Sequence, residues 1–185
     1  VLLLGDRLGP ILWQLPASFR FDPERIGFPS ISGCHAILYL TVNGLFGFHN
    51  AGGSAKDQWA ARADGFANFV RNHFLGNTKG LHLYGCSFVG DNRRGYAMGK
   101  ARKEWKEELK TFASALDYKG HISGYDLHAA GIPDPGSAYV EYRAAGGTCL
   151  ILVKRWTDAG VTRGPNPSKM HHKKRVGGDP NSVIT

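Results

Sequence analysis

The distribution of apolar and polar positions predicts three strands in the middle of the chain. Residues 36–44, AILYLTVNG, form a nearly continuous apolar run, which is typical of a strand buried on both faces. Residues 80–86, GLHLYGC, form a second run, and residues 121–127, HISGYDL, form a short third one. The intervening residues 44–53, GLFGFHNAGG, are interpreted as a glycine-rich loop after the first strand.

Two stretches between these strands repeat apolar residues at the spacing of an α-helix. In residues 55–74 the apolar face consists of Trp59, Ala63, Phe66, Ala67, Val70 and Phe74. In residues 96–117 it consists of Met98, Ala101, Trp105, Leu109, Phe112 and Leu116. Because polar residues occupy most other positions, the pattern predicts two amphipathic helices, each packed on a sheet by its apolar face.

The C-terminal third begins with a pattern of strand, turn and strand. Residues 137–144, SAYVEYRA, and 148–156, TCLILVKRW, flank an Ala-Gly-Gly turn and predict a hairpin. Residues 157–185 show no periodicity and are rich in Pro, Gly and basic residues. They are expected to form an irregular basic tail.

The order of these elements predicts an α/β sandwich. Strand, helix, strand, helix and strand in succession favour a central, largely parallel sheet with right-handed crossovers, followed by the hairpin and the extended tail. Three parts are expected: an N-terminal segment over residues 1–30, an α/β domain over 31–156 and the tail over 157–185.

Composition is consistent with one globular domain and sets limits on its location. The chain of 185 residues is 42% hydrophobic and 21% charged. Its start, VLLLGDRLGPILWQLP, lacks a basic n-region and is interrupted by polar residues, so neither a signal peptide nor a membrane partner is predicted. Cys34, Cys86 and Cys149 are widely spaced without a CxxC pair, which favours reduced thiols and a cytoplasmic location.

The net charge of +8 is concentrated near the C-terminus. Residues 154–175 carry seven Lys and Arg residues against Asp158, a local net charge of +6. An anionic partner, either a nucleic acid or an acidic protein, is one interpretation, and a solvated extension is the other. The candidate anion-binding residues are Lys169, Lys173, Lys174 and Arg175.

The N-terminal segment resembles part of a known family. The motif LGPILWQLPASFRFDPERI, within residues 5–26, is similar to an internal strand, turn and helix of the YecE-like family, whose fold resembles a TIM barrel. A barrel of about 250 residues repeats that unit eight times, and the rest of this chain does not. We interpret the segment as a fragment that supplies one strand and a short helix to another fold, and we transfer no functional residue from it.

The two longest central strands end in Asn43-Gly44 and Gly85-Cys86. With the motif LYGC, this arrangement resembles the caspase-like fold of cysteine peptidases and a related domain of large bacterial surface proteins, over residues 36–127. The resemblance implies that Cys86 is a nucleophile at the end of a strand. The family has a histidine where this chain has Asn43, and asparagine cannot accept a proton near neutral pH. Either the catalytic pair is broken and the site is degenerate, or another histidine serves as the base, for which His49 in the following loop is the candidate.

Further residues are expected near that site. Asp126 ends the third strand, where it would orient a histidine or receive a basic substrate group, or serve simply as a helix N-cap. Asp91, Arg93 and Arg94 follow the cysteine strand and would bind an acidic substrate side chain or a phosphate, or form a solvated loop. If the strands are parallel neighbours, Asn43, Cys86 and Asp126 share one rim of the sheet.

No metal or cofactor is predicted. The spacings HExxH, HxxEH and CxxC are absent, the adjacent His171 and His172 do not converge on one ion, and no Walker loop is present. These absences disfavour a metalloenzyme and a nucleotide hydrolase.

Two functional hypotheses follow. The first is a cysteine-dependent hydrolase that cleaves peptide or amide bonds in a peptide or protein substrate, with Cys86 as nucleophile, His49 as base and backbone N–H groups holding the oxyanion. The alternative interpretation of Cys86 is a buried thiol that takes no part in a reaction. The second hypothesis is a non-enzymatic interaction module that binds an anionic partner through the basic tail.

Overall fold

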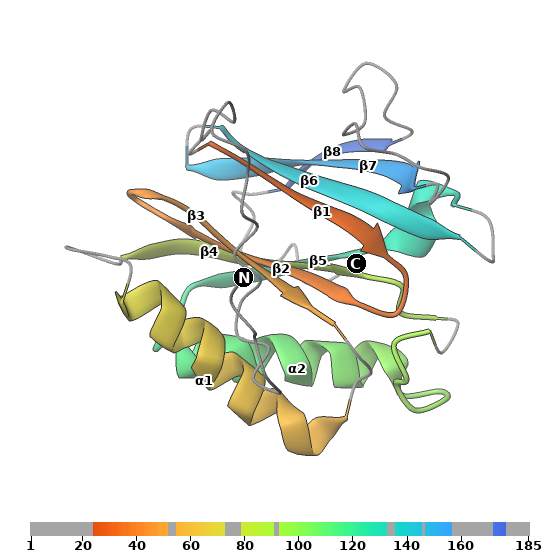
Figure 1. The fold of residues 1–185 in the computed structure, drawn as a ribbon, viewed down its shortest axis with the longest axis horizontal. Coiled ribbons are helices and arrows are strands. Elements are labelled where there is room, and N and C mark those ends of the chain that lie inside the picture. Colours follow the sequence, from red (N-terminus) through yellow and green to blue (C-terminus); the bar gives the residue numbers. More distant parts are fainter. Residues whose placement is uncertain are drawn as a thin grey trace, which may run out of the picture.

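The computed structural model describes residues 24–51, 55–72, 79–90, 93–132, 136–145, 147–156 and 172–176. The described chain forms three layers: an outer sheet, a central sheet and a layer of two helices (Figure 1). The helices are α1 (Lys56–Asn72) and α2 (Ala101–Ala115), and both cover the face of the central sheet that points away from the outer sheet.

The central sheet carries most of the residues that sequence analysis singled out. Its strands, in spatial order, are β3 (Gly44–Asn50), β2 (His35–Thr41), β4 (Gly80–Ser87) and β5 (His121–Asp126). Strand β2 pairs antiparallel with both β3 and β4, whereas β4 and β5 are parallel. A short 3₁₀ helix, η1 (Leu127–Ala130), follows β5.

The outer sheet is antiparallel throughout. Its strands, in spatial order, are β1 (Arg25–Ile31), β6 (Ser137–Ala145), β7 (Thr148–Trp156) and β8 (His172–Val176). The predicted hairpin is confirmed as β6 and β7. Within the stretch expected to be an irregular tail, β8 forms a regular strand that pairs with β7.

The predicted α/β sandwich with a largely parallel central sheet is wrong. More of the described residues lie in strands than in helices, and β4 and β5 form the one parallel pair among the described strands. The error lies in residues 44–50, which were interpreted as a loop but form β3, a strand that reverses direction after a tight turn and pairs with β2. Helix α1 therefore connects β3 to β4, and β2 lies between these two strands, antiparallel to both.

Two apolar cores hold the layers together. Alternate residues of β2 and β4 face the outer sheet, where Leu38 and Tyr84 pack with residues such as Val140 and Ile151. The other face of the central sheet packs on the helices. There the apolar face predicted for α1 is confirmed, and its buried residues are Trp59, Ala63, Phe66, Ala67 and Val70.

Helix α2 follows the prediction in its middle and departs from it at its start. Trp105, Leu109 and Phe112 are fully buried, as expected. Met98 is 98% exposed, because the helix begins three residues later, at Ala101. Two glutamates of the same helix, Glu104 and Glu108, are also buried, which the pattern did not predict.

Several expectations concern residues that the structure describes only in part. Of the segment that resembles part of the YecE-like family, residues 24–26 are described, and Arg25 and Ile26 belong to strand β1 of the outer sheet and not to the predicted short helix. Asp91 and Lys169 lie outside the described residues. Across the described ranges, none of the helices combines the length and the apolar composition that crossing a membrane requires.

Candidate functional site

Cys86 lies near the end of β4, in the core between the two sheets. Its exposed fraction is 0%. The Tyr142 hydroxyl on β6 lies 3.0 Å from Sγ and 3.1 Å from the Ala36 carbonyl oxygen, and both groups can accept its proton. A substrate carbonyl therefore has no access to Sγ in this conformation, and the arrangement matches the alternative of a buried thiol.

His49 shares a sheet face with Cys86 but not a contact. Both residues pair with Ala36, from opposite sides of β2. Two strand spacings separate them, about 10 Å in the hydrogen-bonding direction. His49 Nε2 is buried and has no hydrogen-bond partner in the described part of the chain, and burial followed by the charge of Arg94 lowers the pKa of the imidazole.

Of the three residues expected to share one rim, Cys86 and Asp126 do so and Asn43 does not. Asn43 lies in the turn between β2 and β3, at the rim opposite to Cys86, because β2 runs antiparallel to β4. Asp126 does lie on the rim of Cys86, where its Oδ1 accepts hydrogen bonds from the backbone N–H of His128 at 3.2 Å and of Val89 at 3.3 Å. It caps η1, which is the simpler of the two roles considered for it.

The two arginines of the loop after β4 point to different places. The Arg93 guanidinium lies 4.1 Å from the centre of the Phe88 ring and donates a hydrogen bond to the carbonyl of Gly136. Arg94 is completely buried and pairs with Glu108. The described residues thus show no joint substrate patch of these two side chains.

Glu108 is the centre of a buried polar cluster that sequence analysis missed. Its Oε1 lies 2.6 Å from an Arg94 guanidinium nitrogen and accepts a hydrogen bond from Asn50 Nδ2 at 2.7 Å. Its Oε2 accepts a hydrogen bond from the Tyr96 hydroxyl and lies 3.4 Å from His35 Nδ1. All five side chains are buried, so this cluster links β2, β3, α2 and the loop before α2 without offering a ligand access.

The electrostatics of the cluster are consistent with a structural ion pair. Burial alone would raise the pKa of Glu108, but its interactions with His35 and Arg94 outweigh burial and lower the pKa to about 2. Burial lowers the pKa of His35, so this imidazole is neutral at pH 7. Trp105 Nε1 donates to His35 Nε2 at 3.0 Å, which assigns the proton of the neutral ring to Nδ1, facing Glu108.

A sequence signal for this cluster was present. Glu108 falls between Trp105, Leu109 and Phe112 on the apolar face of α2, where a charged residue requires a buried partner. The partner itself, Arg94, could not be identified from spacing, because the loop that carries it folds back under the sheet.

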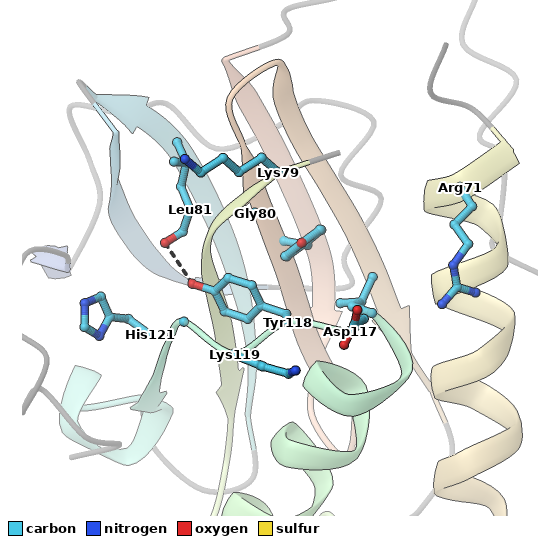
Figure 2. A pocket seen from close by; sticks show the side chains of 11 residues that line it. Arg71, Lys79, Gly80, Leu81, Asp117, Tyr118, Lys119 and His121 are labelled. Carbon is cyan, nitrogen blue, oxygen red and sulfur yellow. Dashed lines mark hydrogen bonds between the residues drawn. The ribbon is translucent and has the colours of Figure 1, made fainter. Parts of the chain in front are cut away.

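A second feature that sequence analysis missed is an open concavity of about 760 Å³ at the other rim of the central sheet. It lies where β4 and β5 begin and where α1 and α2 end. We call it the basic concavity, and its lining residues include Arg71 of α1, Lys79 before β4, Lys119 after α2 and His121 of β5 (Figure 2). All four side chains are exposed.

Two tyrosines, Tyr39 and Tyr118, belong to the lining of the basic concavity. The Tyr118 hydroxyl donates a hydrogen bond to the Leu81 carbonyl oxygen at 2.8 Å, which fixes the loop after α2 to β4. The Tyr39 ring lies edge-on to Tyr118, with 5.4 Å between the ring centres. In the view of Figure 2 the Tyr118 ring lies between the labelled side chains of Lys79 and Lys119.

The charges of the basic concavity favour an anion. The lining includes three residues with a permanent positive charge, Arg71, Lys79 and Lys119, and one carboxylate, Asp117. Arg71 donates to Asn68 Oδ1 at 3.2 Å and to the carbonyl of Ala115, which positions its guanidinium at the end of α2. Since the four basic residues are spread over 51 positions of the sequence and follow no motif, no spacing pattern predicted this site.

Other candidate chemistry is limited. Lys173, Lys174 and Arg175 belong to β8, but their side chains are outside the description. All three cysteines are free thiols, which agrees with the expectation of reduced cysteines. Within the described ranges, no group of three or more His, Cys, Asp and Glu side chains converges as a metal site would require.

Comparisons with known proteins add no relative. The chain was compared with protein-family models, with curated proteins and with solved structures, and none of the three comparisons gives a match.

Proposed function

We propose that the protein is a non-enzymatic interaction module that binds an anionic partner, and that the basic concavity contributes the contact. The observation that carries this proposal is that Arg71, Lys79 and Lys119 all line one hollow, with a single carboxylate, Asp117, among its lining residues. Three cations at one site attract a phosphate or carboxylate group more strongly than any one of them alone.

The alternative hypothesis, a cysteine-dependent hydrolase, has less geometric support. It requires a thiolate open to substrate and a base within hydrogen-bond reach. Cys86 is fully buried, and Ala36 separates it from His49. The binding proposal needs no rearrangement of the fold, because the basic side chains are already exposed.

The proposal is tested with inorganic pyrophosphate, which presents two phosphate groups without any further recognition element. Isothermal titration at about 50 mM salt, where screening is moderate, is expected to detect binding by the full chain. The double variant Lys79→Gln with Lys119→Gln should weaken binding at least fivefold.

A matched control removes two charges elsewhere. The double variant Lys154→Gln with Arg155→Gln lowers the net charge by the same two units, but on β7 of the outer sheet. This control should leave the pyrophosphate affinity within twofold of wild type. Equal losses in both double variants would mean that general charge, and not the basic concavity, attracts the anion.

A further inference from the structure

A second, smaller hollow adjoins the basic concavity and extends it toward α2. It measures about 300 Å³ and shares the wall formed by Asp117, Tyr118 and Lys119. On its far side it is lined by Lys110 and Ser114 of α2. The two hollows are therefore neighbours, and their lining residues together run from the start of β4 to Lys110 and Ser114 of α2.

That side of α2 carries a regular row of cations. Arg102, Lys106 and Lys110 are spaced by four residues, so their side chains emerge from one face at steps of about 6 Å. We call these three residues the α2 basic face. Within the described part of the chain, no ion pair involves any of them, and Ser114 continues the same row into the second hollow.

The acidic residues of α2 are kept away from this row. Glu104 and Glu108 are buried, and Glu104 lies 3.0 Å from Lys56 of α1. Glu107 lies 3.5 Å from the same Lys56 and 4.0 Å from Lys103. Glu104 and Glu107 thus face α1 and Glu108 faces the buried cluster around Arg94, so the flank that carries the α2 basic face has an uncompensated positive charge.

Building on the proposed function, we propose that the anionic partner is a single strand of nucleic acid whose phosphates follow the α2 basic face into the basic concavity. A row of cations suits a polymer with one charge per unit better than it suits a small anion. Tyr118 is half-buried and belongs to the lining of both hollows. In this proposal its ring is the group against which an unpaired base stacks, and duplex bases are not available for such stacking.

A membrane surface fits this path less well. Binding to a bilayer interface combines basic residues with large apolar side chains that enter the lipid. Among the described residues, the exposed large apolar side chains are Val42 and Met98. Neither lines the two hollows.

The test uses the full chain and a fluorescently labelled 12-nucleotide oligothymidylate, with binding followed by anisotropy over a range of salt concentrations. The triple variant Arg102→Gln, Lys106→Gln and Lys110→Gln keeps good helix formers at each position. Its affinity should fall at least tenfold at low salt. Because each lost phosphate contact lowers the slope of log K against log salt by about 0.7, the slope should fall by about 2.

Two further measurements separate this inference from the proposed function. Pyrophosphate affinity should stay within twofold in the triple variant, because the basic concavity is intact. The control triple variant Arg25→Gln, Lys154→Gln and Arg155→Gln, on the outer sheet, should keep the oligonucleotide salt slope.

The outcomes that overturn the inference are distinct. If the wild type binds pyrophosphate but not the oligonucleotide, the nucleic-acid inference is wrong and the proposed function stands. If the wild type binds neither probe, both the inference and the proposed function are wrong. Tighter binding to a duplex, or binding only to vesicles that contain phosphatidylserine, would mean that the partner is not a single strand. If the salt slope of the α2 triple variant equals that of wild type, the α2 basic face does not contact the nucleic acid.

Discussion

Asp117 combines a backbone constraint with a charge at the edge of the basic concavity. It follows the last turn of α2 with a φ of 50°, in the left-handed region that favours glycine. The Tyr118 N–H bonds to the Ala113 carbonyl and the Asp117 N–H to the Ser114 carbonyl, which completes a Schellman motif. The residue is the one carboxylate in the lining of this site and opposes its proposed ligand.

Asp117→Gly should therefore improve two properties together. Relief of the left-handed conformation is expected to raise the free energy of unfolding by about 1 kcal/mol, measured by urea denaturation. Pyrophosphate should bind more tightly, because the repelling carboxylate is gone. Asp117→Asn separates the two effects, since it removes the charge and keeps a side chain on the strained backbone, so a gain in affinity limited to the glycine variant would contradict the electrostatic explanation.

The reactivity of Cys86 decides the remaining hydrolase hypothesis. With Sγ fully buried, alkylation by iodoacetamide at pH 6.5 should be slower at Cys86 than at the half-buried Cys34, as followed by peptide mass spectrometry. Cys149, buried in β7, is the internal control for a thiol protected by the fold alone. Modification of Cys86 ahead of Cys34 would revive the proposed nucleophile.

At the scale of elements, α2 connects the two features of the molecule. Its inner face carries Glu108 and the large apolar residues of the core, and its outer flank carries the α2 basic face. The position of that flank therefore depends on how firmly the helix is packed on the central sheet. Trp105 is the largest fully buried side chain of the described chain and sits at the centre of this packing.

Trp105→Ala is expected to lower the free energy of unfolding by about 3 to 5 kcal/mol, because it leaves a large cavity. It also removes the hydrogen bond to His35. A loss of this size is a large fraction of the free energy of unfolding of about 5 to 15 kcal/mol that is typical of native proteins. Circular dichroism during thermal unfolding measures it.

Met98→Ala is the matched control for this helix, because Met98 belongs to the same predicted apolar face but is 98% exposed. Its effect should stay within about 0.5 kcal/mol. Similar losses in the two variants would mean that α2 is not anchored by Trp105.

At the scale of the whole molecule, the cluster around Glu108 links stability to pH. The pKa of Glu108 is lowered from 4.5 to about 2 on folding, so its contribution is complete above about pH 4.5 and is lost as the pH falls toward 2. The pKa of His35 is lowered from 6.5 by burial, so protonation of the unfolded chain below pH 6.5 also favours unfolding. Both effects predict acid unfolding.

Glu108→Gln tests this link. At pH 7 it should lower the free energy of unfolding by about 3 to 5 kcal/mol, because the Arg94 charge stays buried without its partner. Between pH 4.5 and 2 the variant should lose less additional stability than wild type. Urea denaturation at pH 7, 5 and 3.5 measures both.

Glu107→Gln, a change to a more exposed carboxylate of the same helix, is the control for that experiment. Its stability at pH 7 should stay within about 0.5 kcal/mol of wild type. A Glu108 variant that follows the wild-type dependence on pH would show that other groups control acid unfolding.

Some of this architecture could be predicted from the sequence, because it depends on local periodicity. The apolar face of α1, the buried centre of α2, and the hairpin of β6 and β7 follow from spacings of three to four and of two residues. The same logic applied to β3 would have found it. Phe46 and Phe48 are two residues apart and both pack on the helices, which is the spacing of one face of a strand. Asn43-Gly44 lies between two apolar runs, which is a hairpin signal.

Only the tertiary structure decided which of these elements are neighbours. The turn at Val42-Asn43 reverses the chain, and this single reversal sets β2 antiparallel to β4 and moves Asn43 to the rim opposite Cys86. In the same way, Arg94 meets Glu108, and Lys79 and Lys119 come to line the same hollow, through contacts between distant segments. The pattern of a sequence determines which face a side chain occupies, whereas chain reversals and packing between layers determine what lies opposite that face.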